Sequence, residues 1–258
     1  MSASDDQPIP AATQVIFRGG REGADPELLM VVRSRKMSFA GGMAVFPGGR
    51  VDPADYDLGR QLARGEDPEE LAHRIAAIRE TLEETGLAVG LTGTIDGTLA
   101  REARALLLEQ GALAPVLERF GWAIDRSAII PFARWLPLGM AHSRIFDTRF
   151  YLADLGTGAV DVEVDATENT RLFWVTAKGA LEMAAREEIA VIFPTRRNLE
   201  RLALFSDFAA AKAHAGATPV RIITPQVDES GAAPVLRIPH DAGYPVTTEV
   251  LENAMRGD

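Results

Sequence analysis

The sequence predicts an α/β fold built from short strands and amphipathic helices. Two observations support it. Short apolar runs bounded by glycine or proline recur along the chain, which is typical of buried or half-buried strands. Between them lie longer stretches with apolar residues at spacings of three and four, which is typical of amphipathic helices.

The expected strands are short and apolar. The first two, at 13–18 and 28–33, are separated by a loop rich in glycine. A third, at 43–46, leads into the turn Pro47-Gly48-Gly49, where glycines let the backbone approach a ligand closely. Further strands are expected at 129–136, 146–153 and 171–176, and the tail from residue 219 is expected to form short strands.

The longest expected helix runs from residue 68 to about residue 85. Asp67 is its N-cap, Pro68 takes its first position and Gly86 ends it. Its core-facing stripe, with spacings of four, three and four, consists of Leu71, Ile75, Ile78 and Leu82. Other helices are expected at 177–186 and 194–208, and two short ones between residues 96 and 120.

A cluster of carboxylates lies on the opposite face of the long helix. Glu80, Glu83 and Glu84 stand at positions i, i+3 and i+4. Neighbouring like charges destabilise a helix by a few tenths of a kcal/mol per pair, and a hard divalent cation bound through oxygen would offset this. A solvated charged face is the alternative, but Arg79 and the upstream Phe-Pro-Gly-Gly at 46–49 argue against it.

The end of this helix resembles the second half of the nudix box, whose pattern is Gly-x5-Glu-x7-Arg-Glu-U-x-Glu-Glu-x-Gly-U with U usually aliphatic. The matching residues are Arg79, Glu80, Glu83, Glu84, Gly86 and Leu87. From Gly49 to Arg79 there are 29 intervening residues where the box has 13, so 16 are extra. Counting back from Arg79 places the first box glutamate at Leu71. The candidates for its role are Glu66, Glu69 and Glu70.

Within this superfamily, the chain resembles the peroxisomal coenzyme A diphosphatases and their bacterial relatives, which also carry a long insertion inside the box. The similar stretches are 39–52, 74–81, 146–151 and the strand with Trp174, and the resemblance spans about residues 12–205. A second coenzyme A pattern is matched only by Arg33-Ser34 and Gly42, because Ala40 stands where that pattern has histidine.

The resemblance implies an α/β/α sandwich of a mixed sheet between helices with a small helical insertion, and it implies the roles of several residues. Glu80, Glu83 and Glu84 would bind Mg²⁺ or Mn²⁺ together with a carbonyl of Gly49 or Gly48, and Arg79 would hold a box carboxylate in place. The three glutamates and Arg79, with a general base on a loop, form the predicted catalytic centre. Glu168 is the preferred base and Glu163 the runner-up, with a solvated acidic loop as the alternative.

Substrate contacts are expected from cations and from residues near the glycine turn. The candidates are Arg33, Arg35, Lys36 and Arg149 for phosphates, Phe46 for stacking and Gly48 for close backbone approach. A surface charge is the alternative for each cation, and core packing is the alternative for Phe46.

Composition limits the partners and the organisation. The net charge of −10 argues against a nucleic-acid surface, the absence of cysteine excludes disulfides, and no apolar run approaches the roughly 20 residues of a membrane span. We expect a cytoplasmic enzyme and leave a homodimer open. The expected domain plan is a disordered tail (1–10), a nudix domain (11–210) with insertions at about 50–66 and 96–122, and a C-terminal extension (211–258).

The predicted function is metal-dependent hydrolysis of a diphosphate linkage in a small nucleoside diphosphate compound. Coenzyme A or acyl-coenzyme A is the leading substrate, with phosphopantetheine and 3′,5′-ADP as products. The first alternative is a nudix pyrophosphohydrolase for ADP-ribose or a dinucleotide. The second is a non-catalytic nudix module that senses a ligand.

Overall fold

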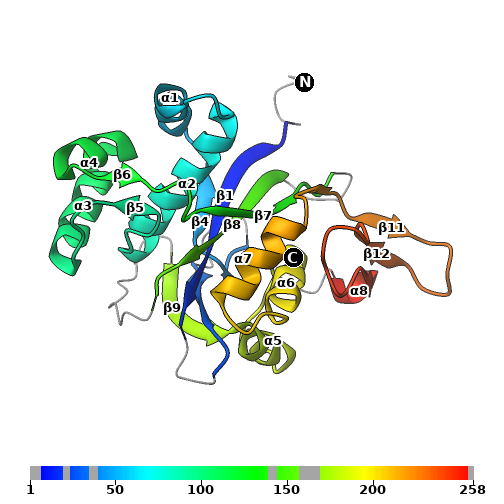
Figure 1. The fold of residues 1–258 in the computed structure, drawn as a ribbon. Coiled ribbons are helices and arrows are strands. Elements are labelled where there is room, and N and C mark those ends of the chain that lie inside the picture. The colour runs from blue at the N-terminus through cyan, green and yellow to red at the C-terminus, as the bar shows by residue number, and fades with distance from the viewer. Residues whose placement is uncertain (1–6, 20–23, 35–39, 139–143, 157–168, 255–258) are drawn as a thin grey trace.

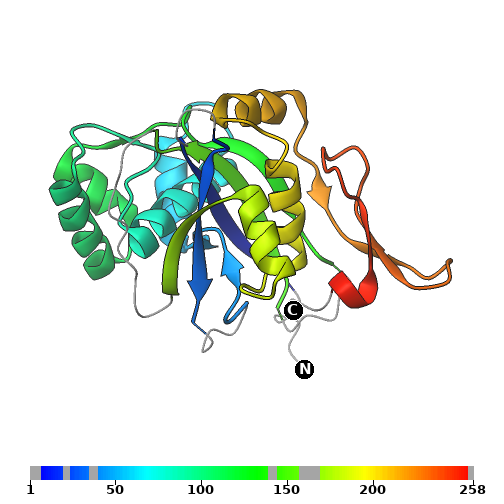
Figure 2. The ribbon, with the colours of Figure 1, turned by 90° about the horizontal axis from the view of Figure 1, so that it is seen from below.

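The computed structural model describes residues 7–19, 24–34, 40–138, 144–156 and 169–254. A mixed sheet runs through the centre, α1 to α4 gather on one side of it, and α5 to α7 lie on the other (Figures 1 and 2). The predicted sandwich of a mixed sheet between helices, with a helical insertion, is confirmed.

The strands are β1 (Ile9–Arg18), β2 (Glu27–Arg33), β3 (Ala44–Val45), β4 (Gly48–Arg50), β5 (Leu91–Thr92), β6 (Ala123–Ile124), β7 (Ile130–Trp135), β8 (Phe146–Asp154), β9 (Asn169–Thr176), β10 (Ile222–Ile223), β11 (Gln226–Asp228), β12 (Val235–Arg237) and β13 (Thr248–Val250). The helices are α1 (Pro53–Leu62), α2 (Pro68–Thr85), α3 (Gly97–Gln110), α4 (Leu113–Phe120), α5 (Ala177–Ala185), α6 (Phe193–Leu202), α7 (Phe208–Ala217) and α8 (Leu251–Ala254).

Eight strands of the described residues form the central sheet, in the order β10-β7-β8-β1-β2-β3, with β4 paired to β1 and β9 paired to β2. The sheet is mixed because β1 runs parallel to β8 and antiparallel to β2 and β4. The pairing of β4 with β1 places Gly49 beside Ala12. The glycine turn is therefore held at the sheet, where α2 can reach it.

Strand alternation gives the sheet two apolar faces. On β1, Val15 and Phe17 enter the core beneath α5 to α7, whereas Ala12 and Ile16 enter the core beneath α1 to α4. Successive side chains of a strand point to opposite faces, so one strand supplies both cores. This is why strands such as β1 read as almost continuous apolar runs.

The long helix forms as the sequence predicts. The side chain of Asp67 accepts a hydrogen bond from the backbone N–H of Glu69, and Gly86 ends the helix in the left-handed conformation at φ 75°. Arg104 of α3 donates to the backbone carbonyl of Glu83 at 2.8 Å, which satisfies one of the last carbonyls of α2. The helical insertion thus supports the end of the helix that carries the carboxylates.

Three details differ from the expectations. β1 begins at Ile9, so residues 9 and 10 of the expected tail are strand, and residues 1–6 lie outside the described part. The helix expected at 194–208 ends at Leu202. Asp207 then caps a second helix, because its side chain accepts from the backbone N–H of Ala210 and so favours a new start over continuation.

Among the described residues, no helix is both long and apolar enough to cross a bilayer.

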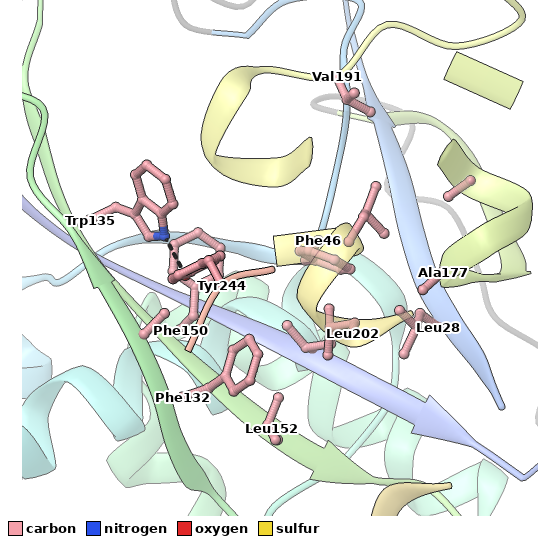
Figure 3. Close-up of a cluster of buried hydrophobic side chains, with 14 of the residues drawn as sticks. Leu28, Phe46, Phe132, Trp135, Phe150, Leu152, Ala177, Val191, Leu202 and Tyr244 are labelled. Carbon is pink, nitrogen blue, oxygen red and sulfur yellow. Dashed lines mark hydrogen bonds between the residues drawn. The ribbon is translucent and has the colours of Figure 1, made fainter. Parts of the chain in front are cut away.

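The C-terminal extension is fixed to the sheet by a buried tyrosine. The indole N–H of Trp135 donates to the hydroxyl of Tyr244 at 2.9 Å, and that hydroxyl donates to Oδ1 of Asn198 at 2.7 Å. Figure 3 shows the first of these bonds beside the aromatic cluster. Burial raises the pKa of Tyr244 to about 12, so its hydroxyl stays protonated. One residue therefore joins β7, α6 and the extension.

Removing that hydroxyl should lower stability. We expect Tyr244→Phe to reduce the free energy of unfolding by about 1–3 kcal/mol, because a buried indole N–H loses its acceptor and Asn198 loses a donor. Urea unfolding followed by circular dichroism measures the change. Tyr56→Phe is the matched control, since the Tyr56 hydroxyl bonds to none of the described residues; equal midpoints for the two variants would contradict the assignment.

Candidate active site

A cavity of about 490 Å³ opens beside the glycine turn. Its acidic end is lined by Gly48, Gly49, Asp52, Glu80 and Glu83, and its apolar end by Phe46, Trp135, Phe150, Phe193, Pro225 and Leu236. This volume falls in the range of small-molecule sites, roughly 300–1,000 Å³. Two of the three carboxylates predicted to bind metal, Glu80 and Glu83, therefore share one cavity with apolar side chains, whereas Glu84 is not part of its lining.

Glycine is required where α2 meets the sheet. A Cβ added at Gly49 would overlap the carboxylate of Glu80, and one added at Gly48 would overlap the backbone of β1. The backbone N–H of Gly48 donates to Oε2 of Glu84 at 3.1 Å. The glycines thus let two carboxylates of the helix approach the backbone of β4, as the sequence predicts for this turn.

The buried carboxylates leave this end of the cavity with excess negative charge. Burial raises the pKa of Glu80 to about 8, and Glu84 and Glu83 add to the rise, although Arg79 opposes it. The Glu80 side chain is only 14% exposed, so water screens this repulsion weakly. The arrangement favours a bound cation, or a proton in its absence.

The oxygen donors fit a hard divalent ion. The carboxylates of Glu80 and Glu84 both lie against the Gly48-Gly49 backbone. No group of three or more His, Cys, Asp or Glu side chains that could hold a metal ion is found in the described part of the chain. Two carboxylates are compatible with Mg²⁺ or Mn²⁺, because Mg²⁺ usually takes one or two protein carboxylates and keeps water and substrate phosphate as its other ligands.

Arg79 is held by a carboxylate of α1. Its Nε and Nη2 donate to Asp55 Oδ1 and Oδ2 at 3.1 and 3.0 Å, and Nη2 also donates to the carbonyl of Arg50 at 2.9 Å. The side chain of Asp55 is 1% exposed and that of Arg79 is 4% exposed. Such a two-pronged bond fixes the orientation of the guanidinium as well as its position.

Asp55 is the functional residue that the sequence analysis missed. Counting forward from Gly49, rather than back from Arg79, places an acidic residue after five others, as the first half of the box requires, and that residue is Asp55. The 16 extra residues then fall between Asp55 and Arg79. The proposed replacements are wrong: Glu66 pairs with Arg126, and Glu69 and Glu70 pair with Arg149.

The predicted substrate residues separate into three groups. Arg33, Phe46 and Gly48 line the cavity. Arg149 does not; its side chain is 11% exposed and is occupied by the two ion pairs with α2, so its proposed phosphate contact is corrected to a structural role. Outside the described residues lie Arg35, Lys36, Glu163 and the preferred base Glu168.

Phe46 serves mainly as core, since it is 2% exposed. Two further cations that the sequence analysis did not propose as contacts, Arg50 and Arg144, line the cavity. Neither Arg33 nor Arg50 forms an ion pair with any carboxylate of the described residues. Both can therefore neutralise an anionic group that enters beside the carboxylates.

Comparison with known proteins finds relatives of the kind that the box residues predict. The NUDIX domain model matches residues 8–107. The chain is 28% identical to acyl-coenzyme A diphosphatase NUDT19 of Gallus gallus, over 70% of this chain and 62% of that protein, and 24% identical to the Xenopus laevis protein of that name, over 71% and 61%. The matches thus span about three fifths of the length of these relatives.

A solved structure covers more of the chain. The nudix hydrolase of Alicyclobacillus acidocaldarius aligns with a TM-score of 0.71 and 28% identity, over 80% of this chain and 96% of that chain. The resemblance predicted from the box residues is confirmed, and the fold with it.

The ion pair between Asp55 and Arg79 should be needed for stability. We expect Asp55→Asn to reduce the free energy of unfolding by about 3 kcal/mol, because it leaves a buried guanidinium without its main partner. Asp57→Asn, two residues along the same helix, removes an exposed pair with Arg60 and should cost less than about 1 kcal/mol. Chemical unfolding of both variants measures the two changes in the free energy of unfolding. Equal changes would contradict the structural role of the Asp55–Arg79 pair.

Metal binding should displace a proton from Glu80. The pKa of about 8 means that this carboxyl is largely protonated at neutral pH without metal. Mn²⁺ affinity should therefore rise about tenfold per pH unit up to about pH 8 and level off above it. Calorimetry in buffers of different ionisation enthalpy measures both affinity and proton release, and a pH-independent affinity with no proton released would count against this assignment.

Proposed function

We propose that this nudix hydrolase cleaves a diphosphate linkage in a small nucleoside diphosphate compound, using divalent ions held by Glu80, Glu84 and the Gly49 carbonyl. The observation that carries the proposal is the common cavity. It is lined by a buried carboxylate, by the glycine turn, and by Arg33 and Arg50, which pair with no carboxylate of the described residues. A diphosphate needs both kinds of charge, cations for its oxygens and carboxylates to hold the metal.

The residues divide the chemistry among them. Bound Mg²⁺ or Mn²⁺ would neutralise phosphate charge and make water more acidic. Glu83 lines the cavity with its side chain 34% exposed, so it can accept a proton from an attacking water, and Glu168 remains the alternative base from sequence. Arg33 and Arg50 would orient the diphosphate. Arg79 and Asp55 would keep Glu80 and Glu83 in place.

Coenzyme A or an acyl-coenzyme A is the substrate we favour. The named relatives are acyl-coenzyme A diphosphatases, and the apolar chamber beside the charged end offers space for the part of the substrate beyond the diphosphate. Hydrolysis would give phosphopantetheine, or its acyl form, and 3′,5′-ADP. ADP-ribose or a dinucleotide is the first alternative, and a ligand-sensing module without activity is the second.

A substrate panel tests the proposal. We expect Mg²⁺- or Mn²⁺-dependent hydrolysis of coenzyme A thioesters at a higher kcat/KM than ADP-ribose or NADH, with products identified by mass. Glu84→Gln should lower kcat by roughly a hundredfold or more, because a neutral amide binds a divalent ion poorly. Glu102→Gln, an exposed residue of α3, should behave like the wild type.

Two outcomes oppose the proposal. Faster hydrolysis of ADP-ribose would favour the first alternative. Nucleotide binding without turnover of any substrate, with either ion present, would favour the sensing module.

A further inference from the structure

The far end of the cavity is closed by residues that lie outside the matched NUDIX domain. Pro225 and Leu236 line it, and both belong to the C-terminal extension, whereas the domain match ends at residue 107. Leu236 is 0% exposed even though it lies on β12, a strand of the small outer sheet. The extension therefore forms part of the wall of the substrate cavity.

This wall is held in a fixed position. β10 pairs with β7 so that Ile223 lies beside Trp135, and the backbone N–H of Leu136 donates to the carbonyl of Ile223 at 2.9 Å. Tyr244 binds the Trp135 indole, and Glu249 pairs with the buried Arg197 at 2.8 Å. Because several bonds hold the extension at the aromatic end, Leu236 presents a rigid boundary to a ligand.

The chamber is better suited to an alkyl chain than to a stacked base. Trp135 and Phe193 are 1% and 5% exposed, and they meet edge to face at 5.9 Å. Trp135 makes a second such contact with Tyr244 at 5.7 Å, and Figure 3 shows these two rings together. Stacking of a base needs an open ring face. Rings that are this well covered offer no open face for a base, so a flexible apolar chain is the better match for these apolar side chains.

We propose that Leu236 and Pro225 determine how long an apolar arm the substrate can carry beyond its diphosphate. The inference rests on the proposed function, because it takes the charged end of the same cavity as the diphosphate site. The arm enters between the aromatic residues of β7 and α6 and ends against β12. Chain-length preference is thus set by the extension, not by the box.

The test changes the size of the boundary residue. Leu236→Phe fills the end of the chamber, and Leu236→Val enlarges it; thermal unfolding confirms that each variant is folded, and Pro225→Ala serves as a second enlargement if either Leu236 variant is not. The readout is the ratio of kcat/KM for palmitoyl- to acetyl-coenzyme A. Leu236→Phe should lower this ratio about tenfold, and the enlarging variants should raise it.

A control and a binding measurement separate the two proposals. Val227→Phe makes a similar change on β11, where the side chain is 46% exposed and does not line the cavity, so its ratio should match the wild type. Binding of the same thioesters without divalent ions, followed by calorimetry, repeats the comparison without turnover. If the variants change the relative affinity for long and short thioesters but neither the wild type nor any variant hydrolyses them, the role of Leu236 and Pro225 is supported and the proposed function is refuted. If all variants hydrolyse the thioesters with the same chain-length preference as the wild type, the proposed role of Leu236 and Pro225 is refuted and the proposed function is not.

Discussion

The buried ion pair between Arg79 and Asp55 is the contact on which the site depends. It joins α2, which carries the carboxylates, to the start of α1, just before the residues inserted in the box. Removing two charges from water is unfavourable unless the pair is well oriented, and the two-pronged geometry together with the Arg50 carbonyl meets that condition. The insertion therefore lengthens the connection without removing the carboxylate that the arginine needs.

The cavity forms because the strand order of the sheet brings segments that are distant in the sequence side by side. β4 brings the glycine wall to β1, β8 lies beside β1, and β7 lies beside β8. The charged end is built close to α2, and the apolar end is built by strands and loops that lie far apart in the sequence. The extension completes that end through contacts with β7 and α6. One fold thus joins a carboxylate-rich end of the cavity to an apolar end that the extension helps to line.

Local patterns predicted much of this, and non-local contacts explain what they missed. Asp67, Pro68 and Gly86 defined α2 because caps act within one turn. The break between α6 and α7 was missed because the apolar spacing continues past Leu202. The single capping residue Asp207 is a weaker signal in the sequence than that spacing. Asp55 was overlooked because its partner lies 24 positions away, although the spacing from Gly49 pointed to it. The roles of Arg149 and Leu236 depend on which elements the sheet brings together, and periodicity contains no such information.

Anomalous diffraction from crystals grown with Mn²⁺ would show whether α2 and the glycine turn together hold a divalent ion. We expect a peak between the carboxylates of Glu80 and Glu84, within coordination distance of the Gly49 carbonyl, and its loss in Glu84→Gln crystals. A manganese peak elsewhere on the protein, with none at this position in the wild type at saturating Mn²⁺, would contradict the account.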